Sequence, residues 1–141
     1  MNLVIDASVV IKFYVPEILS DRAQEVMSGV ADGKLMLLAP DLLYPETGNI
    51  LWKKQRLHEL TPNEVEEIVD AITSLPIKIE HSRQIMPLSV AIALQTGITV
   101  YDAMYAAVAG IYETRMITAD RRLVGALEKT EFKNNVQWLG A

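Results

Sequence analysis

The sequence N-L-V-I-D at residues 2–6 joins a short apolar run to a single carboxylate, Asp6. Two later runs end in the same way: V-Y-D closes at Asp102, and I-T-A-D closes at Asp120. We interpret these runs as buried strands, so the three acids are expected at neighbouring strand ends on one side of a sheet. That edge is where ligands bind in open α/β folds.

A fourth acid, Glu46, lies in Y-P-E-T-G-N-I-L on a predicted helix with strongly apolar flanking sequence. Such flanks favour a half-buried position in a cleft over a solvated helix face. Two like charges 4 Å apart repel by roughly 4 kcal/mol, even at an effective dielectric constant of about 20. A cluster of all four acids therefore predicts a bound divalent cation and metal-dependent phosphoryl transfer.

Each acid also has an ordinary structural explanation. Asp6, Asp102 and Asp120 could each cap the N-terminus of a helix, which is a common role of aspartate. Glu46 alone could belong to a solvated polar face. Asp41, which follows Pro40, is predicted to be the N-cap of the next helix. The metal-site hypothesis rests on the four acids together, because none of them decides the matter alone.

Apolar runs alternate with segments of helical periodicity along the whole chain. The expected strands span 2–6, 35–39, 76–80, 115–118 and 136–139, and the expected helices span 7–15, 17–32, 41–57, 62–74, 82–96, 102–112 and 120–129. The strand runs are mostly apolar, without polar alternation, which is typical of parallel strands covered on both faces. We predict an α/β fold, a three-layer α/β/α sandwich with a central, mostly parallel sheet, built by residues 1–141 as a single domain.

Composition and net charge argue against several classes of function. The chain contains no cysteine, which excludes disulfides, thiolate metal sites and cysteine nucleophiles. Its formal net charge of −5 argues against coating nucleic acid by bulk positive charge. Carboxylates that bind metal contribute to this charge, however, and bound cations would reverse its sign locally.

No targeting signal is evident at the start of the sequence, so the expected location is the cytoplasm. The uncharged stretch from 84 to 101 is long enough to raise the question of a membrane span. It contains Pro87 and reaches a Q-T-G ending at Gly97, so we expect a buried helix and no membrane association.

Four segments together resemble the PIN domain, in particular the VapC-type toxins of prokaryotic toxin–antitoxin pairs: V-I-D-A-S-V, P-E-T-G-N-I-L, Y-D-A-M-Y-A-A-V-A and I-T-A-D-R-R-L. The resemblance extends from the strand at residue 2 to the last strand near Val136. It implies an α/β/α sandwich with the acids in one groove, and a ribonuclease that uses Mg²⁺ or Mn²⁺. The family's catalytic and metal-binding positions fall on Asp6, Glu46, Asp102 and Asp120, and its supporting positions on Ser8, Asn49 and Thr118.

The same resemblance implies an RNA substrate, a cognate antitoxin that packs over the groove, and a homodimer. The apolar segments 11–15 and 42–45 could form either protein interface or part of the core. Basic residues near the groove are candidates for RNA contacts: Lys12, Lys53, Arg56, Arg121 and Arg122. His58 and His81 are expected on the surface, away from the site.

Other functions fit the residues less well. A haloacid-dehalogenase phosphatase needs D-x-D after the first strand, where this chain has Asp6-Ala7-Ser8. A response-regulator receiver needs an acid pair at that strand end and a strand-end lysine. A non-catalytic module, whose acidic groove binds RNA or a basic peptide without cutting it, stays open as the alternative.

Overall fold

The fold is a single five-stranded sheet in the order β3-β2-β1-β4-β5, and every neighbouring pair is parallel. A computed structural model describes all residues, 1–141. Its strands are β1 (Asn2–Ile5), β2 (Met36–Pro40), β3 (Ile77–Glu80), β4 (Met116–Thr118) and β5 (Val136–Trp138). Its α-helices are α1 (Ala7–Val10), α2 (Ser20–Ala31), α3 (Leu43–Arg56), α4 (Pro62–Ser74), α5 (Ser82–Thr96), α6 (Val100–Ile111) and α7 (Arg121–Glu128), and two 3₁₀ turns are η1 (Ile11–Phe13) and η2 (Lys133–Asn135).

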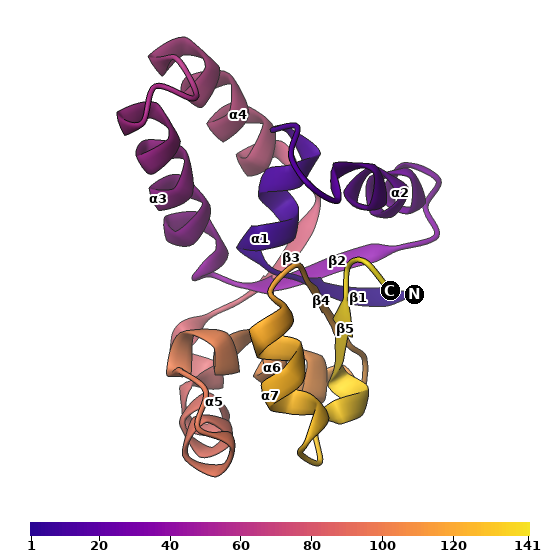
Figure 1. The fold of residues 1–141 in the computed structure, drawn as a ribbon. Helices are drawn as coiled ribbons and strands as arrows, with labels where there is room; N and C mark the ends of the chain where they lie inside the picture. The colour runs from indigo at the N-terminus through magenta and orange to yellow at the C-terminus, as the bar shows by residue number, and fades with distance from the viewer.

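The helices form two layers around this sheet. Helices α1 to α4 lie on one side of it, and α5 to α7 lie on the other (Figure 1). The predicted three-layer α/β/α sandwich is therefore confirmed, with a sheet that is parallel throughout. In such a sheet all strands end at the same edge, so the chain segments that follow β1, β2 and β4 come together there.

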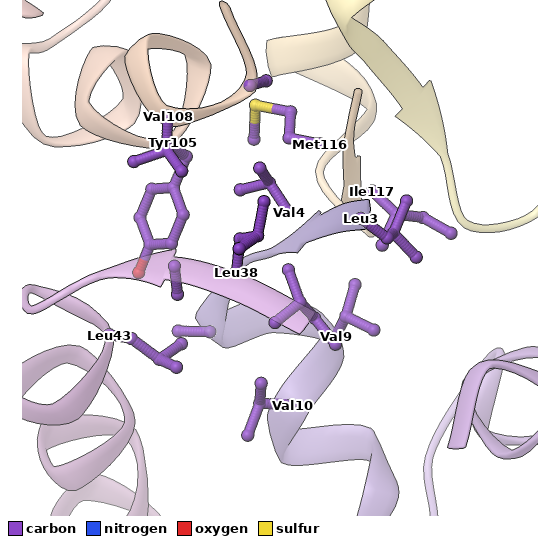
Figure 2. Packing of buried hydrophobic residues seen from close by; sticks show 14 of the residues in the cluster. Leu3, Val4, Val9, Val10, Leu38, Leu43, Tyr105, Val108, Met116 and Ile117 are labelled. Atoms are coloured by element: carbon purple, nitrogen blue, oxygen red, sulfur yellow. The ribbon is translucent and has the colours of Figure 1, made fainter. Parts of the chain in front are cut away.

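The core lies on both faces of the central strands. Val4 and Leu38 are register partners on β1 and β2, and both are almost completely buried. Figure 2 shows their side chains among those of α1 and α6. On α6 every residue from Ala103 to Ala109 is buried, and its alanines let the helix backbone approach the sheet closely. Burial on both faces explains why the strand sequences lack polar alternation.

The predicted helix at 7–15 is shorter in the structure. Helix α1 ends at Val10, and the chain continues through the η1 turn to Tyr14. The predicted helix at 17–32 begins only at Ser20, after Leu19 in the left-handed conformation with φ of 70°. Pro16 explains part of this break, because a proline disfavours the helical conformation of the residue before it. The apolar segment 11–15 was expected to form either an interface or part of the core. Ile11 and Phe13 are buried in the core, and Tyr14 and Val15 pack against it.

Asp41 does not cap the helix that follows it, so that prediction was wrong. Helix α3 has Leu42 at its N-cap position, with no side-chain hydrogen bond. The carboxylate of Asp41 instead accepts from the backbone N of Ser82, at 3.0 Å, at the start of α5. Because β2 and β3 are parallel neighbours with Pro40 opposite Glu80, the residue after β2 lies beside the residues after β3. A cap can thus come from an adjacent strand end.

No single helix is both long enough and apolar enough to span a membrane. Helices α5 and α6 pass such a test only when taken together, and the chain bends by 113° between them.

Candidate active site

Asp6 and Asp120 stand at adjacent strand ends. Asp6 follows β1 directly and caps α1, with Oδ1 accepting from Val9 N at 3.2 Å. Asp120 comes two residues after β4 and caps α7, with Oδ1 accepting from Arg122 N at 3.0 Å and Leu123 N at 3.3 Å. Since β1 and β4 are parallel neighbours, both carboxylates lie at the same edge of the sheet. The capping role and the shared edge therefore coexist.

Asp102 reaches this region by a different route from the predicted one. The run before it is not a strand; helix α6 begins at Val100, and the hydroxyl of Thr99 caps it by accepting from Asp102 N at 3.1 Å. Asp102 therefore lies in the first turn of α6. Glu46 likewise lies in the first turn of α3, the helix that follows β2. The expectation of three strand-end acids is corrected to two strand-end acids and two acids in first helical turns.

The four carboxylates form an electrostatically coupled row. The pKa of Asp6 is raised to about 6, chiefly by burial, and the charge of Glu46 raises it further against opposing hydrogen bonds from Ser8, Thr118 and Val9. Burial also raises the pKa of Glu46, and Asp102 adds to that shift. Burial raises the pKa of Asp102, and Asp120 adds to it. Each acid thus repels the next, in the order Asp6, Glu46, Asp102, Asp120.

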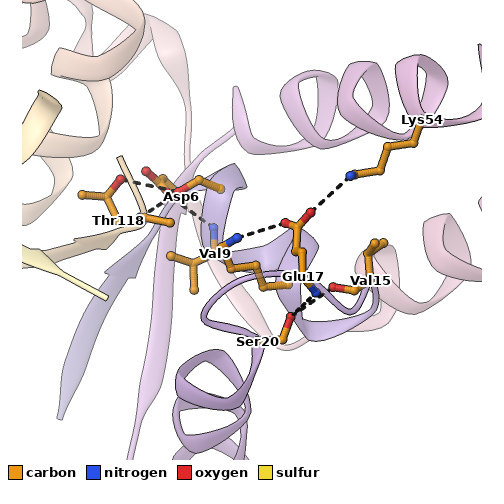
Figure 3. A network of polar contacts seen from close by, with 10 residues as sticks. Asp6, Val9, Val15, Glu17, Ser20, Lys54 and Thr118 are labelled. Atoms are coloured by element: carbon orange, nitrogen blue, oxygen red, sulfur yellow. Dashed lines mark hydrogen bonds and ion pairs between the residues drawn. The ribbon is translucent and has the colours of Figure 1, made fainter. Parts of the chain in front are cut away.

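Two hydroxyls connect the ends of β1 and β4. The Oγ of Ser8 donates to Oδ1 of Asp6 at 2.6 Å and accepts from the backbone N of Ala119 at 2.9 Å. It also lies 3.5 Å from Oγ1 of Thr118, which accepts from the backbone N of Asp120 at 3.1 Å. Figure 3 shows Thr118 beside Asp6 and Val9. Ser8 and Thr118 therefore fix how the two strand-end acids sit relative to each other.

Asn49, the third predicted supporting residue, is exposed on α3 and makes no side-chain hydrogen bond. The structure brings Ser8 and Thr118 to the acids but leaves Asn49 without a contact to them.

Tyr105 belongs to the site and was not predicted from the sequence. Its ring is buried, and its hydroxyl donates to Oε1 of Glu46 at 2.6 Å. Burial and the nearby carboxylates, Glu46 above all, raise the pKa of Tyr105 well above the ordinary range, so the hydroxyl stays protonated. Tyr105 follows Asp102 by three residues, so the two lie on one face of α6. The three-residue spacing from Asp102 was the sequence signal that could have identified Tyr105 as a site residue.

The donor set fits a hard divalent cation. All four acids offer carboxylate oxygen, the ligand type that Mg²⁺ and Mn²⁺ prefer, and no nitrogen or sulfur ligand lies among them. The second oxygens of Glu46 and Asp120 accept no hydrogen bond from the chain. No three acidic side chains converge closely enough to form a ready-made cage. An ion held here would therefore keep several water ligands, as Mg²⁺ usually does.

The basic residues near the site differ in what they contact. Lys12 is committed to an ion pair: it and Lys54 lie 3.0 and 3.2 Å from the carboxylate of Glu17, as Figure 3 shows for Lys54. Burial would raise the pKa of Glu17, but the hydrogen bonds and charges of these lysines outweigh it and lower the pKa. Lys12 is therefore held by an ion pair, and its expected contact with RNA stays a prediction.

Arg122 lies close enough to Asp102 to oppose the rise of that pKa. Arg121 stacks on Trp138 and Arg56 on Trp52, whereas Lys53 is exposed without an ion pair. His81 is exposed and lies 4.0 Å from Asp41, and His58 is exposed with φ of 60°. Both histidines lie outside the four-acid site, as expected.

Comparisons with known proteins point in one direction. The family model described as PIN domain matches residues 3–129. Ribonuclease VapC3 of Pyrobaculum aerophilum is 33% identical over 125 residues, which cover 87% of this chain and 92% of that protein. The identity and the coverage are both high enough to indicate common ancestry over nearly the whole chain.

Three solved structures share the fold. The crystal structure of PAE2754 from Pyrobaculum aerophilum has a TM-score of 0.66 at 23% identity, covering 99% of this chain and 85% of that one. A toxin–antitoxin complex from Klebsiella pneumoniae has a TM-score of 0.59 at 16% identity, covering 84% and 86%. VapBC2 from Rickettsia felis, bound to a promoter DNA fragment, has a TM-score of 0.66 at 12% identity, covering 98% of each chain.

Proposed function

The chain belongs to the PIN domain family, and on that premise we propose that it is a divalent-metal-dependent endoribonuclease, the toxin of a toxin–antitoxin pair. The observation that carries the proposal is the row of four carboxylates at the carboxyl edge of the sheet. Burial and mutual repulsion raise the pKa of Asp6, Glu46 and Asp102, and none of the four acids forms an ion pair within the chain. Such a row needs positive charge from outside.

Mg²⁺ or Mn²⁺ would supply that charge, held by the catalytic and metal-binding acids Asp6, Glu46, Asp102 and Asp120. When bound, a divalent ion acts as a Lewis acid for in-line hydrolysis of a phosphodiester bond. The chain's own contribution is orientation. Ser8 and Val9 fix one oxygen of Asp6, Tyr105 fixes one oxygen of Glu46, and two backbone N–H groups fix one oxygen of Asp120.

Thr118 supports Asp120 through its backbone N. Of the basic residues expected to contact the RNA backbone, Arg122 is the best placed, because its charge acts on Asp102. A phosphate bound between the metal and Arg122 would have its charge neutralised from two sides.

The proposal extends to partners and location. We place the protein in the cytoplasm, with residues 1–141 acting as one domain that a cognate antitoxin inhibits. We also propose a homodimer. Helix α5 leaves Met86 and Leu94 exposed, Leu94 by 83%, and Tyr101 at the start of α6 is 63% exposed. Large apolar side chains left exposed on these two consecutive helices favour a protein interface.

The segments 11–15 and 42–45 contribute Ile11, Phe13 and Leu43 to the core. Leu94→Lys is expected to convert a dimer to a monomer in size-exclusion chromatography with light scattering. A wild-type protein that is monomeric at every concentration would end the dimer proposal.

The experiment that tests the activity is cleavage of a fluorescent single-stranded RNA with Mn²⁺, with Mg²⁺ and with EDTA. Wild type should cut in either metal and not in EDTA, and Asp6→Asn should not cut. Asp70→Asn, an exposed acid on α4, is the matched control and should cut like wild type. Stabilisation by metal without cleavage of any RNA would favour the binding-only alternative.

A further inference from the structure

A hollow of about 460 Å³ lies between α7 and the end of β5, outside the four-acid site. One wall is a face of helix α7, formed by Arg121, Val124, Gly125 and Glu128. The opposite wall comes from the end of the chain, with Val136, Gln137, Trp138 and Ala141. We call it the Trp138 hollow. Its volume falls within the range of about 300–1,000 Å³ that is typical of small-ligand sites.

Arg121 and the backbone at Gly140 cover the ring of Trp138. The guanidinium carbon of Arg121 lies 4.0 Å from the ring centroid. The backbone at Gly140 comes so close that a Cβ there would lie 2.5 Å from the ring. Its Nε1 is buried without a hydrogen-bond partner. Because buried tryptophan N–H groups normally find an acceptor, this donor is left for an acceptor that the chain does not supply.

The hollow lies one strand away from the acids. Trp138 on β5 is the register partner of Thr118 on β4, so the two backbones are about 4.8 Å apart. Thr118 supports Asp120, and Arg121 is the next residue in the chain. The hollow is therefore adjacent to the acids along the carboxyl edge of the sheet.

We propose that the Trp138 hollow binds one base of the single-stranded RNA substrate, an inference that rests on the proposed function. Single-stranded RNA is commonly recognised by stacking of unpaired bases on aromatic rings or guanidinium planes, and here the guanidinium of Arg121 lies over the ring of Trp138. Arg121 also carries a positive charge toward the adjacent phosphate.

The rim of the hollow can accept a hydrogen bond from a base edge. Glu128 is exposed and forms no ion pair. A base in the hollow would thus meet one free carboxylate. A protein side chain is the less fitting occupant, because the site adjoins the acids and carries a planar cation.

A second arginine–tryptophan pair provides a matched control. On α3, the guanidinium carbon of Arg56 lies 5.7 Å from the ring centroid of Trp52, which is 57% exposed. Trp52 does not line the Trp138 hollow. The glycines offer a second matched pair: Gly125 in the hollow and Gly110 on α6 both have open space where a Cβ would stand.

The first measurement is binding of a fluorescein-labelled RNA hexamer of mixed sequence, followed by anisotropy in EDTA so that metal-dependent cleavage cannot occur. Trp138→Ala and Gly125→Leu should each weaken binding about ten-fold, the size expected for one stacked base. Trp52→Ala and Gly110→Leu should remain within about two-fold of wild type. Gly125→Leu fills the hollow and replaces a helix glycine, so it should fold even if Trp138→Ala does not.

The second measurement is tryptophan fluorescence, since the chain has only two tryptophans. RNA should quench the remaining indole in Trp52→Phe, where it is Trp138, and leave it unchanged in Trp138→Phe. Unchanged binding by Gly125→Leu together with no quenching would overturn the inference, and a protein-binding hollow would give that result.

The two proposals can fail separately. A chain that binds RNA through Trp138 but never cuts it in Mn²⁺ keeps this inference and overturns the enzymatic function. A chain that cuts RNA with unchanged KM in both hollow variants does the reverse.

Discussion

Tyr105 donates its hydroxyl proton to Oε1 of Glu46 across 2.6 Å, and this bond links α6 on one side of the sheet to α3 on the other (Figure 1). Figure 2 shows the ring of Tyr105 reaching from α6 to the level of β2. Burial and the charge of Glu46 raise the pKa of Tyr105, so the hydroxyl stays protonated at neutral pH. The bond fixes the orientation of the Glu46 carboxylate and leaves its second oxygen free of hydrogen bonds.

Tyr105→Phe is therefore expected to weaken cleavage about ten-fold, because a partner that orients a metal ligand is commonly worth that much. The fold should persist, since phenylalanine fills the same space. The measurement is the cleavage rate as a function of Mn²⁺ concentration, in which the variant should need more metal. Tyr112→Phe is the matched control: it loses a hydroxyl that donates to Glu80, outside the site, and should cut normally. A wild-type metal dependence in Tyr105→Phe would refute the orienting role.

The strand-end acids could be predicted because their signal is local. Asp6 follows an apolar run directly, and Asp120 follows another after a single residue. Parallel packing brings both acids to one edge, and the structure places β1 and β4 side by side. The helix from 62 to 74 was equally predictable, since Thr61 and Glu64 form a capping box around Pro62.

The other features depend on contacts between distant segments. The run before Asp102 is the start of a helix because the hydroxyl of Thr99 caps it. This hydroxyl accepts from the backbone N of Asp102, which has no partner within the helix. Tyr105 lies within a small-apolar helix and has its partner 59 positions away. Asp41 can accept from the first residue of α5 only because β2 and β3 are neighbours. Local patterns carry no information about such partners.

Asp6→Asn is expected to stabilise the metal-free protein while it abolishes cleavage. Asp6 is only 7% exposed, and burial raises its pKa from 3.8 to about 6. Keeping it ionised at neutral pH therefore costs on the order of 1–3 kcal/mol of folding free energy. Asparagine retains the acceptor for Ser8 and Val9 without the charge. Urea unfolding in EDTA at pH 7.5 measures the difference, and Asp70→Asn should show none.

The pH dependence of this difference has a definite sign. A carboxyl whose pKa is raised in the folded state contributes stability below its unfolded pKa of 3.8, and that stability is lost as pH rises through about 6. In EDTA, the advantage of Asp6→Asn over wild type should therefore grow between about pH 4 and 7. Comparing the two proteins removes the opposite contributions of Glu17 and Asp41, whose pKa values are lowered. A constant difference across that range would contradict the raised pKa.

Divalent metal should reverse the order of stability. A ligand present at 100 times its dissociation constant stabilises the folded state by about 2.7 kcal/mol. Wild type should gain this from Mn²⁺ because Asp6 is ionised and available, whereas Asp6→Asn has lost a charged ligand and should gain much less. The melting temperature of Asp6→Asn is then expected to lie above that of wild type in EDTA and below it in saturating Mn²⁺. Asp70→Asn should follow wild type in both buffers. If Mn²⁺ raised the melting temperatures of Asp6→Asn and wild type by the same amount, Asp6 would not be a metal ligand, and its buried charge would need another explanation.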